Sequence, residues 1–586
     1  MGSVKVRAAL LGVILSVGTS WTHAATITID DSTKGQRQVI DGFGTCIGSA
    51  GSQDWFQRAY YDDMACSIMR MDLSPCFKSP YSDNSYNSPW FGNAPPLKID
   101  DPANLGGPEH NYVRTYKNAS DYTRDFGGHR AAIAVMGPDI AKNISFFDYD
   151  KVSAQGAMAQ AGLARKEKLG DFKLYGSVWS PAPWVKIANG QKWGNHQGIM
   201  PATGTPFPFI WGGNFAGGKV DTSDTPLSVF DDGTGPTSAL TQFARCTAAY
   251  IKGFQDKFGV KFYAISIQNE LNFPEFYNSC VYANAPEYIA ALKAVRREFD
   301  RQPDLKDILI AGPEDVLGGD PYSMWQYGGG GNPTHKNLQY LTAIARDDEA
   351  AKALGFFCIH GYARDGATAA GADSPSWLRW SDGWKESPAP GIPPNVAGFT
   401  AYQKKSWMTE SSGEKPVWLE PATGFPGNGA WSIALKMQQA FTAGRESACL
   451  YWQFAEADKP ATSIECLTSH QDTTQGPKYV AFKHFARFIR PGSIVVQTAV
   501  ADDHGVTASA YLQPDHATLV IVLVGKNTEA EPASITLPDD FAGAKSLHVV
   551  TSSEGKLWQE SDATADHGTV TLNVPAYSVV TMIVNK

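Results

Sequence analysis

Short apolar segments of strand character alternate with helix-like segments along most of the chain, and this alternation constrains the fold more than any other feature. We expect eight strands, at residues 39–43, 67–73, 172–179, 262–268, 308–311, 356–360, 406–409 and 448–453. Helical stretches fall between several of them, at 237–258, 285–300, 338–354 and 431–443. Eight strands with crossover helices are the count of a (β/α)8 TIM barrel, an α/β fold. A doubly wound open sheet is the alternative, but no glycine-rich phosphate loop follows any of these strands.

A second, purely β pattern follows Arg490-Pro491-Gly492. Seven short β-branched runs, separated by Gly, Asp, Asn and Pro, lie between residues 494 and 584, which is typical of a β-sandwich. The segment 26–30 also has strand character, and we expect it to pair into the same sandwich. The sequence therefore divides into a signal peptide (1–24), an N-terminal strand of the sandwich (25–37), the barrel (38–490) and the all-β sandwich domain (491–586).

The N-terminus has the three parts of a secretory signal peptide. Lys5 and Arg7 precede a mostly apolar run at 8–17, and Thr22-His23-Ala24 then forms a small-residue cleavage site. The run is too short to span a bilayer, and no later stretch is long enough to do so. We expect a mature chain from about residue 25 that is secreted or periplasmic and has no membrane span.

Charge and cysteine content exclude some classes of function. The chain has 50 Lys and Arg residues against 59 Asp and Glu, a net charge of −9, so it lacks the basic footprint of a nucleic-acid binder. The eight cysteines include no CxxC pair and no zinc spacing with histidine. We expect no metal and no cofactor. The cysteines fit either a few disulfides, with Cys66 or Cys46 to Cys76 as the local candidate, or buried free thiols.

Two apolar strands end in a carboxyl side chain. The strand at 262–268 is followed by Asn269 and Glu270, and the strand at 406–409 by Glu410. Barrel enzymes place catalytic residues at the carboxyl ends of their strands. Two carboxyls about 5 to 5.5 Å apart can cleave a glycosidic bond with retention, whereas about 6.5 to 9.5 Å leaves room for a water and gives inversion. Glu420 also ends a short apolar run and is a second candidate for the nucleophile, and Glu270 could be an ordinary acidic residue at a strand end.

Eight short motifs occur in order over nearly the whole mature chain. They are Ile40-Asp41-Gly42-Phe43-Gly44, Met69-Arg70-Met71-Asp72, Trp179-Ser180-Pro181-Ala182-Pro183-Trp184, Gln268-Asn269-Glu270, His360-Gly361-Tyr362, Trp407-Met408-Thr409-Glu410, Tyr451-Trp452-Gln453 and Phe488-Ile489-Arg490-Pro491-Gly492. In this register the chain resembles glycoside hydrolase family 30. The resemblance implies a retaining glycosidase with a (β/α)8 barrel and an attached β-sandwich.

The resemblance also implies roles for particular residues. Glu270 would be the acid/base, Glu410 the nucleophile, and Asn269 the ligand of the sugar hydroxyl next to the reacting carbon. Arg70 would lie beside the nucleophile and keep it ionised. The other implied substrate-binding residues line the same pocket, with two tryptophans as its floor; they are His360, Tyr362, Trp179 and Trp452. Structural alternatives are that Arg70 is a buried ion-pair partner, that His360 is a core histidine with satisfied hydrogen bonds, and that either tryptophan is a plain core residue.

The chain departs from the family pattern in two respects. Leu271 follows the acid where many members have Pro, and the loops after the second, third and sixth strands are longer. Connections at 74–130, 185–236, 318–336 and 363–402 are long, and loops at this end of a barrel build its binding face. Solvated insertions are the alternative. Because these loops build the subsites, they leave the substrate open.

The resulting hypothesis is a secreted, monomeric, retaining β-glycoside hydrolase that acts on a β-linked polysaccharide or oligosaccharide. The family implies β-1,6-glucanase, β-1,6-galactanase or xylanase activity, and the absence of an obvious basic patch in the loops slightly disfavours xylanases that bind acidic side groups. A glucosylceramidase-like glycosidase, a noncatalytic glycan-binding protein on the same barrel and a transglycosylase are the alternatives.

Overall fold

The computed structural model describes the chain from residue 24 to residue 586 with gaps. The described residues are 24–47, 49–74, 76–78, 113–114, 125–126, 129–130, 134–179, 181–188, 209–210, 218–270, 282, 284–317, 324–325, 337–362, 374–420, 429–455, 463–469, 476–501 and 505–586. The predicted signal peptide up to residue 23, Cys280 and large parts of the four long connections lie outside these residues.

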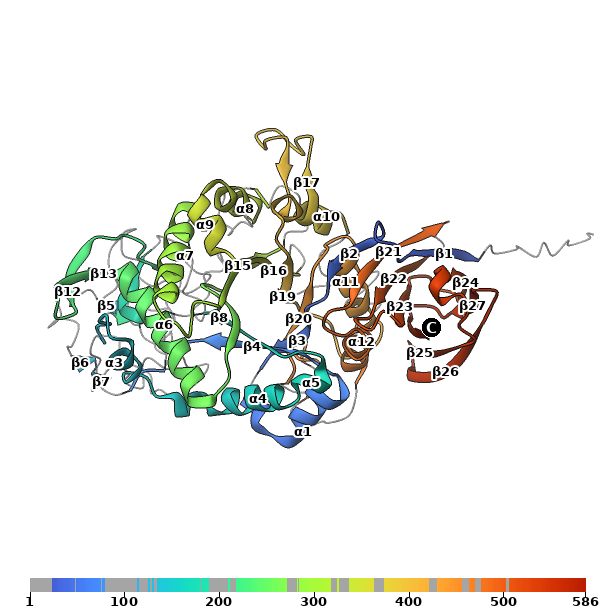
Figure 1. Ribbon diagram of the computed structural model, residues 1–586, viewed down its shortest axis with the longest axis horizontal. Helices are drawn as coiled ribbons and strands as arrows, with labels where there is room; N and C mark the ends of the chain where they lie inside the picture. The colour runs from blue at the N-terminus through green and yellow to red at the C-terminus, as the bar shows by residue number, and fades with distance from the viewer. Residues whose placement is uncertain are drawn as a thin grey trace, which may run out of the picture.

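Eight parallel strands close into a barrel, and strands adjacent in the chain are adjacent in the barrel (Figure 1). They are β3 (Gly42–Cys46), β4 (Ile68–Leu73), β8 (Lys173–Val178), β14 (Phe262–Ser266), β15 (Leu309–Val316), β16 (Phe356–His360), β19 (Ser406–Glu410) and β20 (Ala448–Gln453), which closes on β3. All eight predicted strands are present and the predicted fold class is confirmed. The first strand begins at Gly42 rather than Val39, because Val39 belongs to a strand of the other domain.

Helices cover the outside of the barrel (Figure 1). They are α1 (Asp54–Gln57), α3 (Ile140–Ile144), α4 (Ser153–Ala164), α5 (Lys166–Leu169), α6 (Ala239–Phe258), α7 (Ala285–Asp300), α8 (Asn337–Arg346), α9 (Asp348–Ala353), α10 (Ser374–Asp382), α11 (Trp431–Thr442) and α12 (Pro477–Ala486). The single helix predicted at 338–354 is two helices, because Asp347 has an extended backbone and its side chain caps α9 at the N–H of Ala350.

An all-β domain with its own apolar core follows the barrel. Its strands are β1 (Ala25–Asp30), β2 (Gln36–Val39), β21 (Ile494–Ala501), β22 (Val506–Leu512), β23 (Thr518–Gly525), β24 (Glu531–Thr536), β25 (Ser546–Ser553), β26 (Lys556–Asp566), β27 (Thr569–Val574) and β28 (Val579–Asn585). The N-terminal strand β1 lies between β21, antiparallel, and β24, parallel. Strand β26 was not predicted, because most of its side chains are exposed and it has no apolar alternation.

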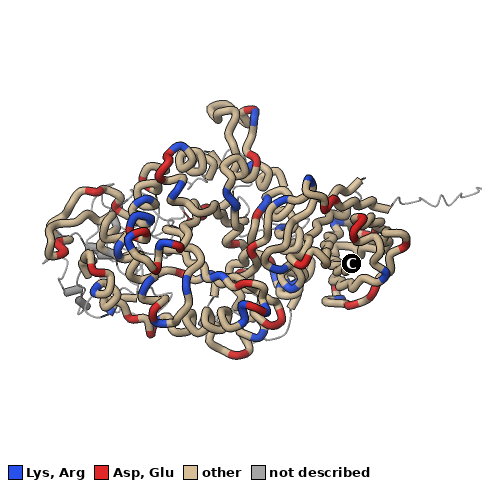
Figure 2. Tube along the Cα trace, viewed as in Figure 1, with Lys and Arg blue, Asp and Glu red and all other residues tan. Residues whose placement is uncertain are grey.

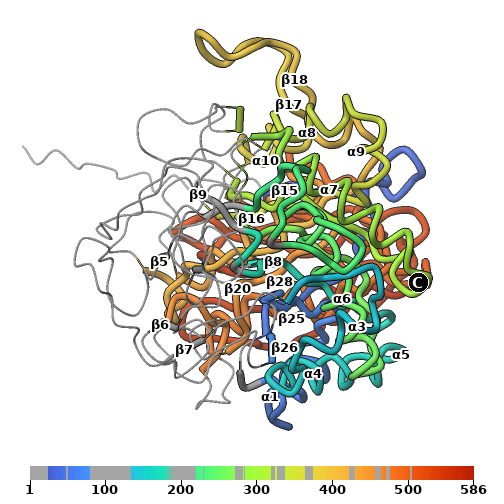
Figure 3. Tube along the Cα trace, turned by 90° about the vertical axis from the view of Figure 1, so that its left-hand side faces the viewer, coloured from blue at the N-terminus to red at the C-terminus, as the bar shows by residue number. Residues whose placement is uncertain are grey.

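Short two-stranded sheets lie in the connections between these elements. They are β5 (Val113–Arg114) with β10 (Phe209–Ile210), β6 (Asp125–Phe126) with β7 (His129–Arg130), β9 (Lys186–Ala188) with β11 (Gly218–Val220), β12 (Pro226–Asp231) with β13 (Pro236–Ser238), and β17 (Gly383–Trp384) with β18 (Val396–Ala397). The last sheet projects from the body of the molecule (Figures 1 and 3). The connection at 363–402 is therefore not structureless, since it holds α10 and this hairpin.

Polar contacts join the all-β domain to the barrel. The indole N–H of Trp418, eight residues after Glu410, donates to the carbonyl of Tyr577 at 2.6 Å. His484 on α12 lies between the hydroxyls of Thr581 and Ser552, at 2.9 and 2.8 Å, and burial lowers its pKa to about 3. The imidazole is therefore neutral and bonds two hydroxyls across the interface. The domain boundary at residue 491 remains a proposal, whereas the predicted boundary at residue 38 falls inside β2, which pairs with β21 of the all-β domain.

The cysteines of the described residues are free and buried, namely Cys46, Cys66, Cys76, Cys246, Cys358, Cys449 and Cys466. The local disulfide predicted from Cys66 or Cys46 to Cys76 is therefore wrong. These cysteines lie on different strands and loops and, for Cys246, on helix α6, and each is buried, where a thiol acts as a small apolar group. Lys and Arg positions are interspersed with Asp and Glu positions along the backbone of both domains (Figure 2). Among the described residues, no helix combines the length and apolarity needed to cross a bilayer.

A partly buried polar cluster lies at the amino ends of the barrel strands. Asp41, directly before β3, accepts from the indole N–H of Trp407 at 2.7 Å and pairs with Lys405 at 2.6 Å. The ammonium of Lys405 also donates to the hydroxyl of Tyr263 at 2.7 Å and lies over the Tyr263 ring. Burial lowers the pKa of Lys405, but Asp41 outweighs this and leaves the pKa raised. This pole lies opposite the ends that carry Glu270 and Glu410.

We predict that Asp41→Ala lowers the free energy of unfolding by about 1 to 3 kcal/mol, because it leaves the buried indole N–H of Trp407 without its acceptor and the ammonium of Lys405 without its opposite charge. Urea denaturation of the full chain measures this. The matched control is Asp256→Ala, which removes an exposed ion pair with Lys252 and should cost less than about 1 kcal/mol. Equal losses in the two variants would contradict the account.

Candidate active site

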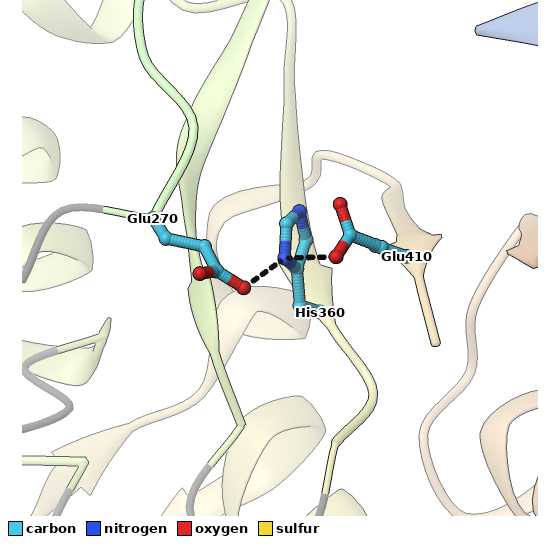
Figure 4. Close-up of side chains that lie close together, drawn as sticks. All are labelled: Glu270, His360 and Glu410. Atoms are coloured by element: carbon cyan, nitrogen blue, oxygen red, sulfur yellow. Dashed lines mark hydrogen bonds and ion pairs between the residues drawn. The ribbon is translucent and has the colours of Figure 1, made fainter. Parts of the chain in front are cut away.

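The carboxyl ends of the barrel strands bring together side chains that are far apart in the sequence. Figure 4 shows His360, at the end of β16, between Glu270, which follows β14, and Glu410, at the end of β19. His360 Nδ1 lies 2.8 Å from Glu270 Oε1 and 3.7 Å from Glu410 Oε1. One carboxylate oxygen of each glutamate and a ring nitrogen of the histidine all lie within 4.8 Å of one another. Both glutamates are buried, at 6% and 5% exposure.

This separation has a chemical consequence. Two carboxyls about 5 to 5.5 Å apart suit attack by one carboxylate on a sugar carbon while the other donates a proton, and about 6.5 Å or more is needed to seat a water between them. The nearest carboxylate oxygens of Glu270 and Glu410 lie within 4.8 Å of each other, which is well below the separation that would seat a water. The arrangement is therefore suited to covalent double displacement at an acetal carbon.

Arg70 on β4 is fully buried and holds two of the predicted site residues. Its Nη1 donates to Glu410 Oε2 at 2.5 Å and its Nη2 to Asn269 Oδ1 at 2.5 Å. Burial alone would lower the pKa of Arg70, but Glu410 and Glu314 raise it above its ordinary value. The guanidinium is therefore a fixed cation. Because it binds the oxygen of the Asn269 amide, it also sets which end of that amide is the acceptor.

Glu410 receives hydrogen bonds on both carboxylate oxygens. Oε2 accepts from Arg70, and Oε1 accepts from the hydroxyl of Tyr362 at 2.8 Å. Burial raises the pKa of Glu410, and the charges of His360 and Arg70 act against it without outweighing it. Arg70 therefore acts in the predicted direction, but the carboxyl titrates above the ordinary range of a glutamate.

His360 is surrounded by carboxylates. Burial lowers its pKa, but Glu410, the hydrogen bond to Glu270 and the nearby carboxylate of Glu314 raise it to about 10. The ring is therefore an imidazolium at neutral pH. Its Nδ1–H donates to Glu270, and its charge is shared among all three acids.

The two predicted tryptophans stack on each other beside Arg70. The rings of Trp179, directly after β8, and Trp452 on β20 are 5.1 Å apart with an interplanar angle of 19°. Trp179 is buried, whereas Trp452 is partly exposed and its ring lies 5.6 Å from the Arg70 guanidinium carbon. The pair therefore presents an apolar face next to the charged groups, which is the surface that sugar rings stack on.

Glu314 belongs to the same cluster and was not predicted. It is fully buried on β15, and its Oε1 lies 3.6 Å from both Arg70 Nη2 and His360 Nε2. The sequence 308–314 is an apolar strand that ends in a carboxyl, the same signal that identified Glu270. Applied to every strand, that signal would have found it.

Asp72 lies two residues beyond Arg70 on β4 and was predicted only as part of a motif. It is partly exposed, and its Oδ1 accepts from the Cys46 thiol at 3.5 Å. Burial raises the pKa of Asp72 to about 6, and Arg70 acts against that shift. Alternation along β4 directs both side chains to the inside of the barrel, so Asp72 is a further acid at its mouth.

Glu420, the second candidate for the nucleophile, does not belong to a barrel strand. It lies in an irregular segment between β19 and α11, is partly exposed and pairs with Lys415 at 3.7 Å. The structure therefore brings Glu410, and not Glu420, to the His360 side of the barrel mouth.

Glu270, His360 and Glu410 have a spacing that could hold a metal ion. The charges do not fit one, because an imidazolium has no lone pair for a metal and Arg70 already neutralises Glu410. His360 and Arg70 supply the positive charge that a metal would otherwise provide.

No family model matches the chain, and no curated protein matches it. Solved structures match along almost the whole length. The catalytic domain of a glycoside hydrolase family 30 (GH30) xylanase C from Talaromyces cellulolyticus is 16% identical, with a TM-score of 0.61 over 96% of this chain and 100% of that one. A GH30 endoxylanase from Clostridium papyrosolvens C71 is 16% identical, with a TM-score of 0.59 over 96% and 100%. The endo-β1,6-glucanase BT3312 is 15% identical, with a TM-score of 0.55 over 96% and 94%. The chain therefore shares the fold of solved GH30 enzymes, as the sequence motifs implied.

Proposed function

We propose that the protein is a retaining β-glycoside hydrolase that cleaves a β-linked polysaccharide or oligosaccharide. Glu270 is the acid/base and Glu410 the nucleophile. The observation that carries this proposal is the approach of the two carboxylates to within 4.8 Å at the carboxyl ends of barrel strands. The shared fold with GH30 xylanases and an endo-β1,6-glucanase supports the same reaction class.

The reaction runs in two displacements. A carboxylate oxygen of Glu410 attacks the anomeric carbon, the glycosidic bond breaks, and Glu270 gives its proton to the departing oxygen. Glu270 then takes a proton from a water, whose oxygen attacks the same carbon and releases Glu410. Each displacement inverts the carbon, so the product keeps the configuration of the substrate.

The surrounding residues prepare the first displacement. Arg70 and Tyr362 each donate to one oxygen of Glu410, which fixes the direction of attack and stabilises the ionised form. Asn269 is held by Arg70 and binds the hydroxyl next to the reacting carbon. Trp452, backed by Trp179, stacks on the sugar face. Orientation of this kind removes part of the entropic barrier before the bond breaks.

The substrate class proposed is that of the solved neighbours and of the family that the motifs resemble. We propose a β-1,6-glucanase, β-1,6-galactanase or xylanase type of activity, with a glucosylceramidase-like activity as the alternative. We propose from the N-terminal sequence that the enzyme is exported. We also propose that it is a monomer. A purely glycan-binding protein would have no use for two buried carboxylates fixed at this separation by an arginine and a histidine.

We predict that Glu410→Ala lowers kcat on any cleaved β-glycan by about 10⁴-fold or more, because the covalent step is lost. Binding of the same glycan, measured by calorimetry, should survive. Azide added to the variant should restore turnover and yield an α-glycosyl azide, since the small anion enters the space of the missing carboxylate. The control is Glu420→Ala, which should keep wild-type turnover. Loss of activity in Glu420→Ala with normal activity in Glu410→Ala would overturn the assignment.

A second prediction concerns the acidic limb of the pH profile. Because burial raises the pKa of Glu410 and Arg70 lowers it, removal of the guanidinium should raise that pKa further. Arg70→Met should therefore move the acidic limb of kcat/KM to higher pH by about 1 to 3 units. Arg70→Lys keeps the charge and should move it less. The profile below its optimum measures both, and an acidic limb that stays at the same pH in Arg70→Met would contradict the account.

A further inference from the structure

Glu314 is a buried carboxylate that takes no part in the two displacements. Its side chain is fully buried, and an ionised carboxylate is costly to bury unless partners compensate it. The hydroxyl of Tyr175 donates to Oε1 at 2.9 Å and that of Ser177 to Oε2 at 2.7 Å. Burial raises the pKa of Glu314, but the charges of Arg70 and His360 and the hydrogen bond from Ser177 outweigh it and leave the pKa lowered. Glu314 is therefore an anion.

The carboxylate of Glu314 contacts both cations of the site, Arg70 and His360, on the sides that face away from Glu410 and Glu270. Its Oε1 lies 3.6 Å from Arg70 Nη2 and 3.6 Å from His360 Nε2. On their other sides, Arg70 holds Glu410 and His360 holds Glu270. Ser177 adds a second link, because its hydroxyl accepts from Arg70 Nε at 3.3 Å while it donates to Glu314. One carboxylate therefore acts on both reacting carboxylates through the cations between them.

The backbone also ties Glu314 to Glu270. The N–H of Glu270 donates to the carbonyl of Glu314 at 2.8 Å. Both residues have left-handed backbone, with φ of 50° for Glu270 and 51° for Glu314. A left-handed conformation is unfavourable for residues other than glycine and persists where the surroundings fix it. The two strand ends are thus held in one relative position, which keeps both side chains against His360.

We propose that Glu314 is a positioning residue that keeps His360 protonated, so that the Glu270–His360 pair stores the proton delivered to the leaving group. This inference rests on the proposed acid/base role of Glu270. The proton passes from His360 Nδ1 to Glu270 Oε1 and then to the glycosidic oxygen as the bond to carbon breaks. This transfer leaves a neutral His360 beside an ionised Glu270. In the second displacement the proton taken from water by Glu270 returns to His360 and restores the pair.

The groups that face His360 and Glu314 come from every neighbouring element. They are Arg70 and Asp72 on β4, Tyr175 on β8, Glu270 after β14, Tyr288 on α7, Cys358 on β16, Tyr362 after β16 and Glu410 on β19. Burial raises the pKa of the three tyrosines and the cysteine, so these four are neutral. The groups that stabilise the charge of His360 are the carboxylates of Glu270, Glu314 and Glu410, and Glu314 is the one of these three that does not react.

The direct test is the protonation state of His360. In the full-length chain with ¹³C-labelled histidine, NMR reports the titration of each ring, and comparison with His360→Gln assigns the signal. We expect His360 to stay protonated past pH 8 in the wild-type protein, consistent with a pKa near 10. Glu314→Gln should lower that titration by about 1 to 3 pH units. Tyr175→Phe removes a hydrogen bond to the same carboxylate but keeps its charge, and should shift the titration by less than about 0.5 unit.

Kinetics supply the second readout. The basic limb of kcat/KM should move to lower pH in Glu314→Gln, with KM close to the wild-type value, whereas Tyr175→Phe should keep the wild-type limb. A neutral His360 in the wild-type protein at pH 8 would overturn the inference, even if Glu314→Gln does not fold. An unchanged titration in a folded Glu314→Gln would also overturn it. A shifted titration in a protein that cleaves no β-glycan would refute the proposed function and leave the effect of Glu314 on His360 standing.

Discussion

The site depends on a balance of buried charges. Three carboxylates, Glu270, Glu314 and Glu410, meet two cations, Arg70 and His360, at the carboxyl ends of the barrel strands. Removing one partner from such a group leaves an uncompensated buried charge, which costs about 3 to 5 kcal/mol. Each group is therefore held by the others. Glu270 and Glu410, the two carboxylates that we propose to react, can lie close together because a cation lies between or beside them, and that closeness is what the covalent route requires.

The barrel makes this balance possible. The five side chains come from β4, β15, β16 and β19 and from the residue that follows β14, and strands of a closed parallel sheet fix their ends relative to one another. At the opposite pole lie Asp41, Lys405 and Trp407. The all-β domain touches the segment after Glu410 through Trp418. The residues that stabilise the barrel and the residues of the candidate active site therefore lie at opposite ends of the barrel axis, as is usual for this fold.

Much of this arrangement could be predicted from the sequence, because it depends on local patterns. Apolar runs of four to eight residues identified each barrel strand, and a carboxyl at a strand end identified Glu270 and Glu410. The failures have physical reasons as well. The apolar periodicity at 338–354 predicts one helix, but Asp347 interrupts it and caps a second helix. Strand β26 is mostly exposed and has no apolar alternation that would predict a strand.

The contacts within the site lie beyond sequence patterns. Glu314 carries the same signal as Glu270, but the sequence alone does not tell that its carboxylate faces both Arg70 and His360. Nor does it tell that burial outweighs Arg70 in setting the pKa of Glu410. These features arise from distances across the barrel, between residues up to 340 positions apart in the chain. The proximity of Cys46, Cys66 and Cys76 in sequence was likewise a poor guide, since all three are free.

The most direct test of the central claim is the configuration of the first product. The purified enzyme is mixed with a β-linked glycan that it cleaves, and NMR follows the anomeric proton before mutarotation. Glu270 and Glu410, less than 5 Å apart at their nearest oxygens, predict that the β-anomer appears first. Initial release of the α-anomer would show a single inverting displacement by water and would contradict the account.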